Sequence, residues 1–141
     1  MTQRIPLVFA CSGCSNAGHL TDRLARELDR RGIAEMSCLA GMGAAKPPFL
    51  KRLSEREVWV IDGCPIECSL GVFDQIRQHI DAHIRLHDLG VRKNASLPAD
   101  DDFHNLIDAV LQHVDQQKQS VLHSRGIDHS SPHDLATQPP P

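Results

Sequence analysis

The chain is poor in aromatic residues and has no long apolar run. Of its 141 residues 4% are aromatic, with one tryptophan and no tyrosine. So little aromatic surface argues against a stacking platform for single-stranded nucleic acid and against an aromatic-rich β-sandwich. The apolar run at residues 5–10 is too short for the core of a signal peptide, and no apolar stretch approaches membrane-spanning length. Neither export nor membrane insertion is predicted, and we expect a cytoplasmic protein.

The chain also lacks an excess of positive charge. Lysine and arginine together number 15 against 18 acidic residues, which gives a formal charge of −3. A basic surface for nucleic acid is therefore not expected. Hydrophobic residues make up 40% of the chain, which is enough to bury the core of one ordinary domain. The sequence identifies no protein partner, substrate or oligomeric state.

Short apolar segments alternate with helical patterns along the chain. Strands are predicted over 5–10, 33–38, 58–61 and 82–88, and helices over 16–31, 47–53, 67–80 and 103–114, with a flexible stretch at 41–45. This order predicts one α/β domain over residues 1–116, with an open, mainly parallel four-stranded sheet of the Rossmann or flavodoxin type and helices on both faces. The segment 117–141 is rich in Gln, His and Pro and is expected to be disordered.

Five cysteines are the most informative feature of the sequence. Because five is odd, a complete set of internal disulfides would leave one thiol over, and clustered cysteines in a reducing cytoplasm indicate metal binding or redox chemistry. Each cysteine follows or ends a predicted strand. With the common strand order 2-1-3-4, the first and third strands are neighbours about 4.8 Å apart, and their following loops face each other at the ligand-binding edge. The cysteines are Cys11 and Cys14 after the first strand, Cys38 at the second, and Cys64 and Cys68 after the third.

These positions predict a zinc site formed by the thiolates of Cys11, Cys14, Cys64 and Cys68, with Cys38 as a reserve or fifth thiol. A sensor, carrier or thiol-regulatory role would suit such a site, because the metal would link two loops of a sheet that has its own core. Two alternatives use the same thiols: an iron–sulfur cluster, and an enzyme that cycles a dithiol and a disulfide. Whether the protein is an enzyme stays open.

Two kinds of phosphate chemistry are disfavoured. Low-molecular-weight tyrosine phosphatases and related arsenate reductases need an arginine six residues after the nucleophilic cysteine. Counted from Cys11 that residue is Ala17, and counted from Cys14 it is Leu20. The loop also lacks the lysine of a phosphate-binding P-loop.

Polar residues around the third and fourth strands have simpler interpretations. Asp62 could accept a hydrogen bond from a metal ligand, or it could form the turn before Gly63. Glu67 is expected to place a negative charge at the start of a helix. His83 and His87 alternate with Ile84 and Leu86, which predicts that both histidines lie on a solvated strand face.

Several separated segments resemble the DGC-domain family, in which a central Asp-Gly-Cys motif, here Asp62-Gly63-Cys64, supplies the name. The segments are 11–16 (CSGCSN), 35–41 (EMSCLAG), 61–68 (IDGCPIEC) and 83–90 (HIRLHDLG). The resemblance covers residues 5–115 and implies a small cytoplasmic protein with metal-chelating cysteines and no assigned reaction. It leaves the segment beyond residue 116 outside the family.

Overall fold

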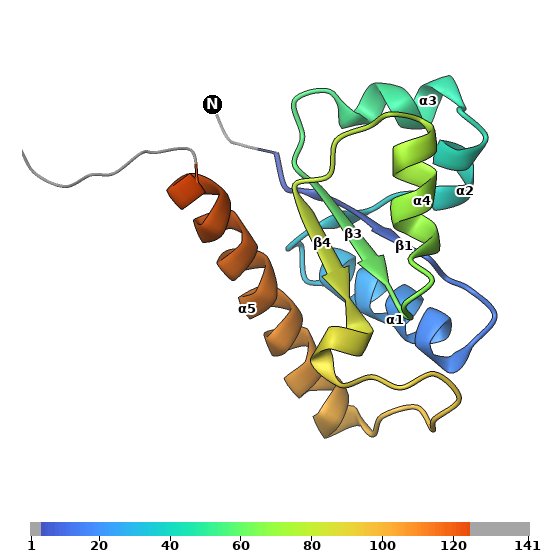
Figure 1. Ribbon diagram of the computed structural model, residues 1–141, viewed down its shortest axis with the longest axis vertical. Coiled ribbons are helices and arrows are strands. Elements are labelled where there is room, and N and C mark those ends of the chain that lie inside the picture. Colours follow the sequence, from blue (N-terminus) through green and yellow to red (C-terminus); the bar gives the residue numbers. More distant parts are fainter. Residues whose placement is uncertain (1–3, 125–141) are drawn as a thin grey trace, which may run out of the picture.

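The computed structural model describes residues 4–124 and contains one four-stranded sheet between two layers of helices (Figure 1). The strands lie in the order β2-β1-β3-β4, and all three pairings between neighbours are parallel. The predicted fold class and strand order are confirmed. The strands are β1 (Leu7–Ala10), β2 (Glu35–Met36), β3 (Val58–Asp62) and β4 (Ala82–Arg85).

The described residues also form five α-helices and two short 3-10 helices. They are α1 (Asn16–Arg30), α2 (Leu39–Gly43), α3 (Pro47–Leu50), η1 (Lys51–Leu53), α4 (Cys68–Gln75), η2 (Leu86–Leu89) and α5 (Asp100–Ser124). Helix α1 begins where the sequence predicts, because the Ser15 hydroxyl accepts a hydrogen bond from the Gly18 amide and caps the first turn.

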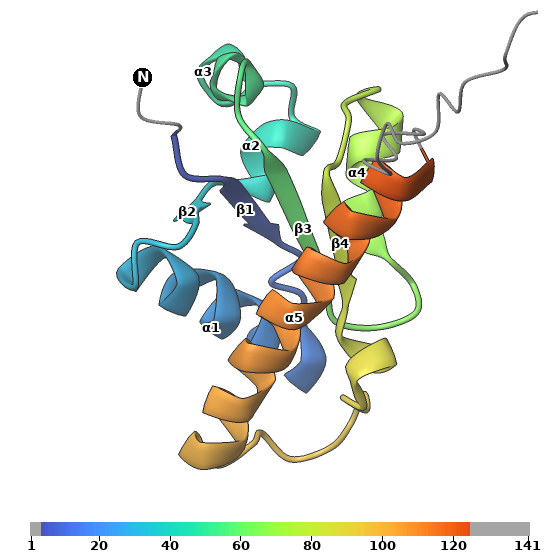
Figure 2. The same cartoon turned by 90° about the vertical axis from the view of Figure 1, so that its left-hand side faces the viewer.

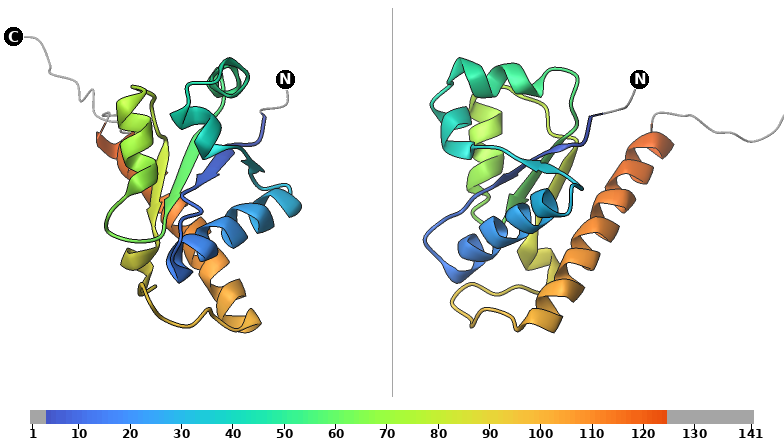
Figure 3. Two further views of the ribbon diagram at one scale, coloured as in Figure 1. Left: turned by 90° about the vertical axis from the view of Figure 1, so that its right-hand side faces the viewer. Right: turned by 180° about the vertical axis from the view of Figure 1, so that it is seen from behind.

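Both faces of the sheet are apolar, as a parallel sheet with helices on both sides requires. On one face Val8 and Ala10 of β1 pack with residues of α1 and α5. On the other, Leu7 and Phe9 pack with Met42 of α2 and with α4. Figures 2 and 3 show the sheet between these two helix layers. The cysteine loops therefore begin at the carboxyl ends of β1 and β3, in a sheet that is packed on both faces.

Several elements differ from the sequence-based expectations, and the strand predicted over 33–38 is reduced to Glu35–Met36. The stretch expected to be flexible contains helix α2, which is capped by the Cys38 sulfur. The helix expected to reach residue 80 ends at Gln75, because the chain reverses at Arg77 in the left-handed region, with a φ of 54°. The fourth strand ends at Arg85, and η2 follows it until Gly90 turns the chain. In the last two cases local backbone geometry ends an element that the apolar pattern alone would extend.

Helix α5 continues to Ser124, past the predicted domain end at residue 116. Gln117 holds this extension: its side-chain oxygen accepts from the His83 amide at 2.9 Å, and its side-chain nitrogen donates to the His83 carbonyl at 2.7 Å. The side chain thus pairs with the free backbone edge of β4, an edge strand. The remainder of the tail expected to be disordered, residues 125–141, lies outside the described residues. Across 4–124, no helix is long and apolar enough to cross a bilayer.

Candidate functional site

The loop after β1 carries Cys11 and is fixed to α1 through Thr21. The Cys11 amide donates to the Ile61 carbonyl of β3 at 3.1 Å, and the Ser12 amide donates to the Thr21 hydroxyl at 3.1 Å. Thr21 gives its own proton to the Gly18 carbonyl, 2.7 Å away. The Cys11 sulfur, 3.3 Å from the same hydroxyl, therefore fits as a donor through its S–H group. Thr21 thus holds the Cys11 side chain in place at the carboxyl end of β1.

Close glycine contacts bring both cysteine loops against the first turn of α1. A Cβ on Gly18 would lie 2.6 Å from the Gly13 nitrogen, in the loop after β1. A Cβ on Gly63, in the loop after β3, would lie 2.6 Å from the Ala17 carbonyl carbon and oxygen. Since real Cβ atoms do not approach backbone this closely, both positions require glycine. The second residue of the Asp-Gly-Cys motif thus packs the Cys64 loop on the helix that also carries the Cys11 loop.

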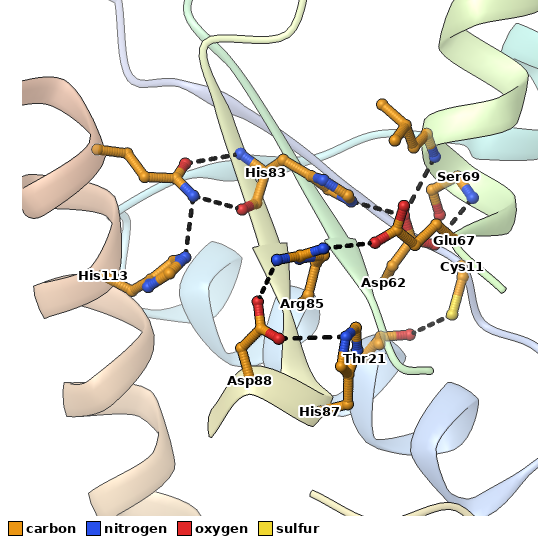
Figure 4. A network of polar contacts seen from close by, with 12 residues as sticks. Cys11, Thr21, Asp62, Glu67, Ser69, His83, Arg85, His87, Asp88 and His113 are labelled. Atoms are coloured by element: carbon orange, nitrogen blue, oxygen red, sulfur yellow. Dashed lines mark hydrogen bonds and ion pairs between the residues drawn. The ribbon is translucent and has the colours of Figure 1, made fainter. Parts of the chain in front are cut away.

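Asp62, the first residue of the motif, anchors α4 from the end of β3. Its carboxylate is 1% exposed and accepts hydrogen bonds from the amides of Ser69 at 2.8 Å and Leu70 at 3.1 Å (Figure 4). These are free amides at the start of α4, where the N-cap residue Glu67 has a left-handed backbone and gives no side-chain cap. The His83 ring nitrogen Nε2 lies 2.8 Å from the same carboxylate. Asp62 therefore caps the N-terminus of α4 from the end of β3.

The protonation of Asp62 follows from these contacts. Burial would raise the pKa of its carboxyl group, but the hydrogen bonds from His83 and from the amides of Ser69 and Leu70 outweigh burial. The pKa of Asp62 therefore lies below its ordinary value, and the side chain is a carboxylate at neutral pH.

A chain of ion pairs connects the second cysteine loop to η2. Glu67, between Cys64 and Cys68, accepts from Arg85 at 3.0 Å, and Arg85 also pairs with Asp88 at 2.7 Å. The hydrogen bond that Arg85 donates to Glu67, together with the charge of Asp88, raises the pKa of Arg85. Asp88 then lies 3.1 Å from Nε2 of His87 (Figure 4). The interpretation of Glu67 as a charge at a helix start omits its main contact, which is with the neighbouring strand.

The five cysteines are free thiols at the carboxyl edge of the sheet, and Cys14, Cys38 and Cys68 are exposed. Cys11 and Cys38 line one cleft of about 990 Å³, whereas Cys64 lines a separate pocket of about 430 Å³. Within residues 4–124, no three His, Cys, Asp or Glu side chains are gathered as a shared set of metal ligands. The donor type fits zinc, since thiolates are among its preferred ligands. Coordination by these residues stays a prediction.

The two histidines are not on a solvated strand face, and that expectation is wrong. His83 contacts Asp62, and its side chain is 20% exposed. His87 lies in η2, beyond the end of the strand, and its Nδ1 atom is buried. The predicted strand order places His83 on the strand beside β3, but the turn that redirects His87 has no clear signal in the sequence.

A small parallel α/β domain with cysteine loops at the carboxyl edge is thus the class that the fold and the site define. The model of the DGC domain matches residues 7–123, and the chain belongs to this family. It is 42% identical over 90 residues to the anaerobic and virulence modulator AnvM of Pseudomonas aeruginosa, an alignment that covers 63% of this chain and 69% of that protein. No solved structure matches the chain.

Proposed function

We propose that this protein binds zinc through thiolates of its two cysteine loops, with Cys11, Cys14, Cys64 and Cys68 as the ligands. The observation that carries the proposal is the packing of both loops against one turn of α1, through the close contacts of Gly18 and Gly63. When bound, zinc would supply a cross-link between loops that follow neighbouring strands. Exposure of Cys14 and Cys68 leaves these thiols accessible to an incoming metal ion.

Cys38, the cysteine outside the two loops, caps a helix. Its sulfur accepts a hydrogen bond from the Gly41 amide at 3.3 Å and caps α2. Cys38 also follows β2, and β1 lies between β2 and β3, the strand that leads into the loop of Cys64 and Cys68. This supports Cys38 as the spare thiol.

A regulatory role is proposed by similarity. The relative from Pseudomonas aeruginosa is named as a modulator, which favours regulation over catalysis for a protein with the same domain. Metal binding suits regulation here because the sheet has apolar cores on both faces. The loops could therefore gain or lose a metal while the domain stays folded.

Elemental analysis and an absorption spectrum of protein purified without oxygen test the proposal. Zinc equimolar with the chain in a colourless sample supports it. Bound iron with visible absorption would instead assign an iron–sulfur cluster. Metal-free protein in which Cys11 and Cys14 form a reversible disulfide would assign the dithiol enzyme. Either of these results would refute zinc as the resident metal.

A further inference from the structure

We propose that His113 and Gln117 form a pH-sensitive strap between α5 and the edge of β4. The strap holds the end of α5 on the strand while His113 is neutral, and it loosens when His113 gains a proton. It is independent of zinc binding, because neither residue belongs to the cysteine loops.

The end of α5 is held by polar contacts rather than by burial. The buried residues of the helix end at Val114, although the helix continues to Ser124. Every described residue after Gln117 is exposed. Val121 and Leu122, the large apolar residues of this part, are 42% and 55% exposed. No apolar core therefore fixes α5 between Val114 and Ser124.

Gln117 is the main anchor of this part of the helix. Its side chain makes two hydrogen bonds with the backbone of His83, at 2.9 and 2.7 Å. One turn of α5 further on lies a second contact, the ion pair of Lys118 with Glu57 at 3.1 Å, and the Lys118 side chain is 46% exposed. Because exposed ion pairs stabilise weakly, the hold on β4 depends chiefly on the Gln117 amide.

The contacts of Gln117 determine where His113 carries its proton. The Gln117 oxygen accepts from the His83 N–H group and the nitrogen donates to the His83 carbonyl, so the amide has one orientation. The same nitrogen lies 2.9 Å from Nε2 of His113 and has a second N–H group to donate (Figure 4). Nε2 is therefore an acceptor, and the proton of the neutral ring lies on Nδ1.

Protonation of His113 removes this acceptor. A proton on Nε2 would face the Gln117 N–H group, and two donors cannot share a hydrogen bond. If the amide turned to accept from the charged ring, its nitrogen would face the His83 N–H group and its oxygen the His83 carbonyl. Both orientations lose hydrogen bonds. Since unperturbed histidine gains its proton near about pH 6.5, the strap is closed above that range and loosens below it.

The charged groups on the elements packed against α5 are bound to other partners. Within residues 4–124, Gln117 is the one hydrogen-bonding partner of His113. The helix residues three and four positions from His113 are uncharged: Ala109, Val110, Gln116 and Gln117. The charged and titratable groups on β3, β4, η2 and their ends pair as Asp62 with His83, Arg85 with Glu67 and Asp88, Asp88 with His87, Asp81 with His79, and Glu57 with Lys118. None of these carboxylates is positioned to hold a charged His113 in place.

The part of α5 beyond the strap forms one wall of a groove. Lys118, Val121 and Leu122 line this groove, of about 670 Å³, together with Ile80 and Asp81 in the segment before β4. Because this wall follows Gln117 directly, loosening of the strap would open the groove and expose the backbone edge of β4.

Hydrogen exchange at the His83 amide, measured by NMR on the full chain, tests the strap. Protection factors, which correct for the intrinsic effect of pH on exchange, are compared at about pH 7.5 and about pH 5.5, on either side of the range in which histidine titrates. His113→Gln offers an acceptor oxygen near the position of Nε2 and does not titrate in this range. It keeps the pair of the His83 ring with Asp62, so any pH effect of that pair remains in the comparison. His113→Leu removes the acceptor.

We expect protection of the wild-type His83 amide to fall roughly three- to tenfold at the lower pH, which is the effect of one lost hydrogen bond. Protection should stay high at both pH values in His113→Gln and low at both in His113→Leu. The nitrogen chemical shifts of His113 should place its proton on Nδ1 at the higher pH. An equal pH response in wild type and His113→Gln would overturn the strap, as would a neutral His113 with its proton on Nε2.

Discussion

Replacement of Asp62 by asparagine should destabilise the domain strongly, because this carboxylate joins β3, β4 and the start of α4. Asparagine retains one acceptor oxygen, but its NH₂ group would face a buried donor, either an amide of α4 or the His83 ring. A hydrogen bond to a charged group contributes about 1.5–3 kcal/mol, and a buried unpaired donor costs about 1–3 kcal/mol. Because these effects overlap, we expect a loss of about 2–4 kcal/mol from a total stability of about 5–15 kcal/mol.

The assay is urea denaturation, with hydrogen exchange at the Ser69 and Leu70 amides as a local measure. Exchange at both amides should accelerate in Asp62→Asn, whereas Asp74→Asn, an exposed change on the same helix, should alter neither stability nor exchange. The difference in the free energy of unfolding between wild type and Asp62→Asn should also depend on pH. The pKa of Asp62 is lowered by folding, so its stabilisation is complete above the unfolded pKa, about 4, and is lost as the pH falls through the folded value. A loss below about 0.5 kcal/mol at pH 7 would refute this role of Asp62, since a surface substitution has effects of that size.

Other substitutions test the packing of the loops and helices. Gly63→Ala should lower the stability by about 1–3 kcal/mol, because the added Cβ overlaps the α1 backbone. Gly71→Ala, where α4 leaves open space, should raise the stability by up to about 1 kcal/mol. Thermal unfolding measures both. A chain truncated after residue 116 should unfold at lower urea than one truncated after Ser124, because the Gln117 contacts with β4 are lost at about 1 kcal/mol per hydrogen bond. Equal midpoints for the two truncations would show that the end of α5 does not support the sheet.

The arrangement of the sheet could be predicted because it depends on repeated patterns. Each strand is a short apolar run, and the alternation with helices leaves few ways to order four parallel strands. The positions of the cysteines at strand ends follow directly from that order. The boundaries of α2, α4 and β4 could not be predicted, because each is determined by one or two residues. Cys38 caps α2 through its sulfur, and Arg77 ends its segment with a left-handed backbone.

The polar contacts of the site were harder to foresee than its cysteines. Asp62 and His83 are distant in sequence, and they meet because β3 and β4 pair in register. His87 lies in η2, beyond the end of β4, and no residue pattern in the sequence predicts this turn. The roles of Gly18 and Gly63 likewise depend on tertiary contacts with Gly13 and Ala17. Sequence patterns therefore identified the thiols, whereas the residues that hold the thiols in place required the structure.

Zinc affinity of Cys64→Ser and Cys38→Ser, each compared with wild type under reducing conditions, tests the central claim most directly. We predict that Cys64→Ser abolishes tight zinc binding, that Cys38→Ser retains it, and that both variants keep the circular dichroism spectrum of the wild type. Wild-type affinity in Cys64→Ser would contradict a metal site at this loop. Global unfolding of Cys64→Ser would contradict the claim that the two apolar cores hold the domain without metal.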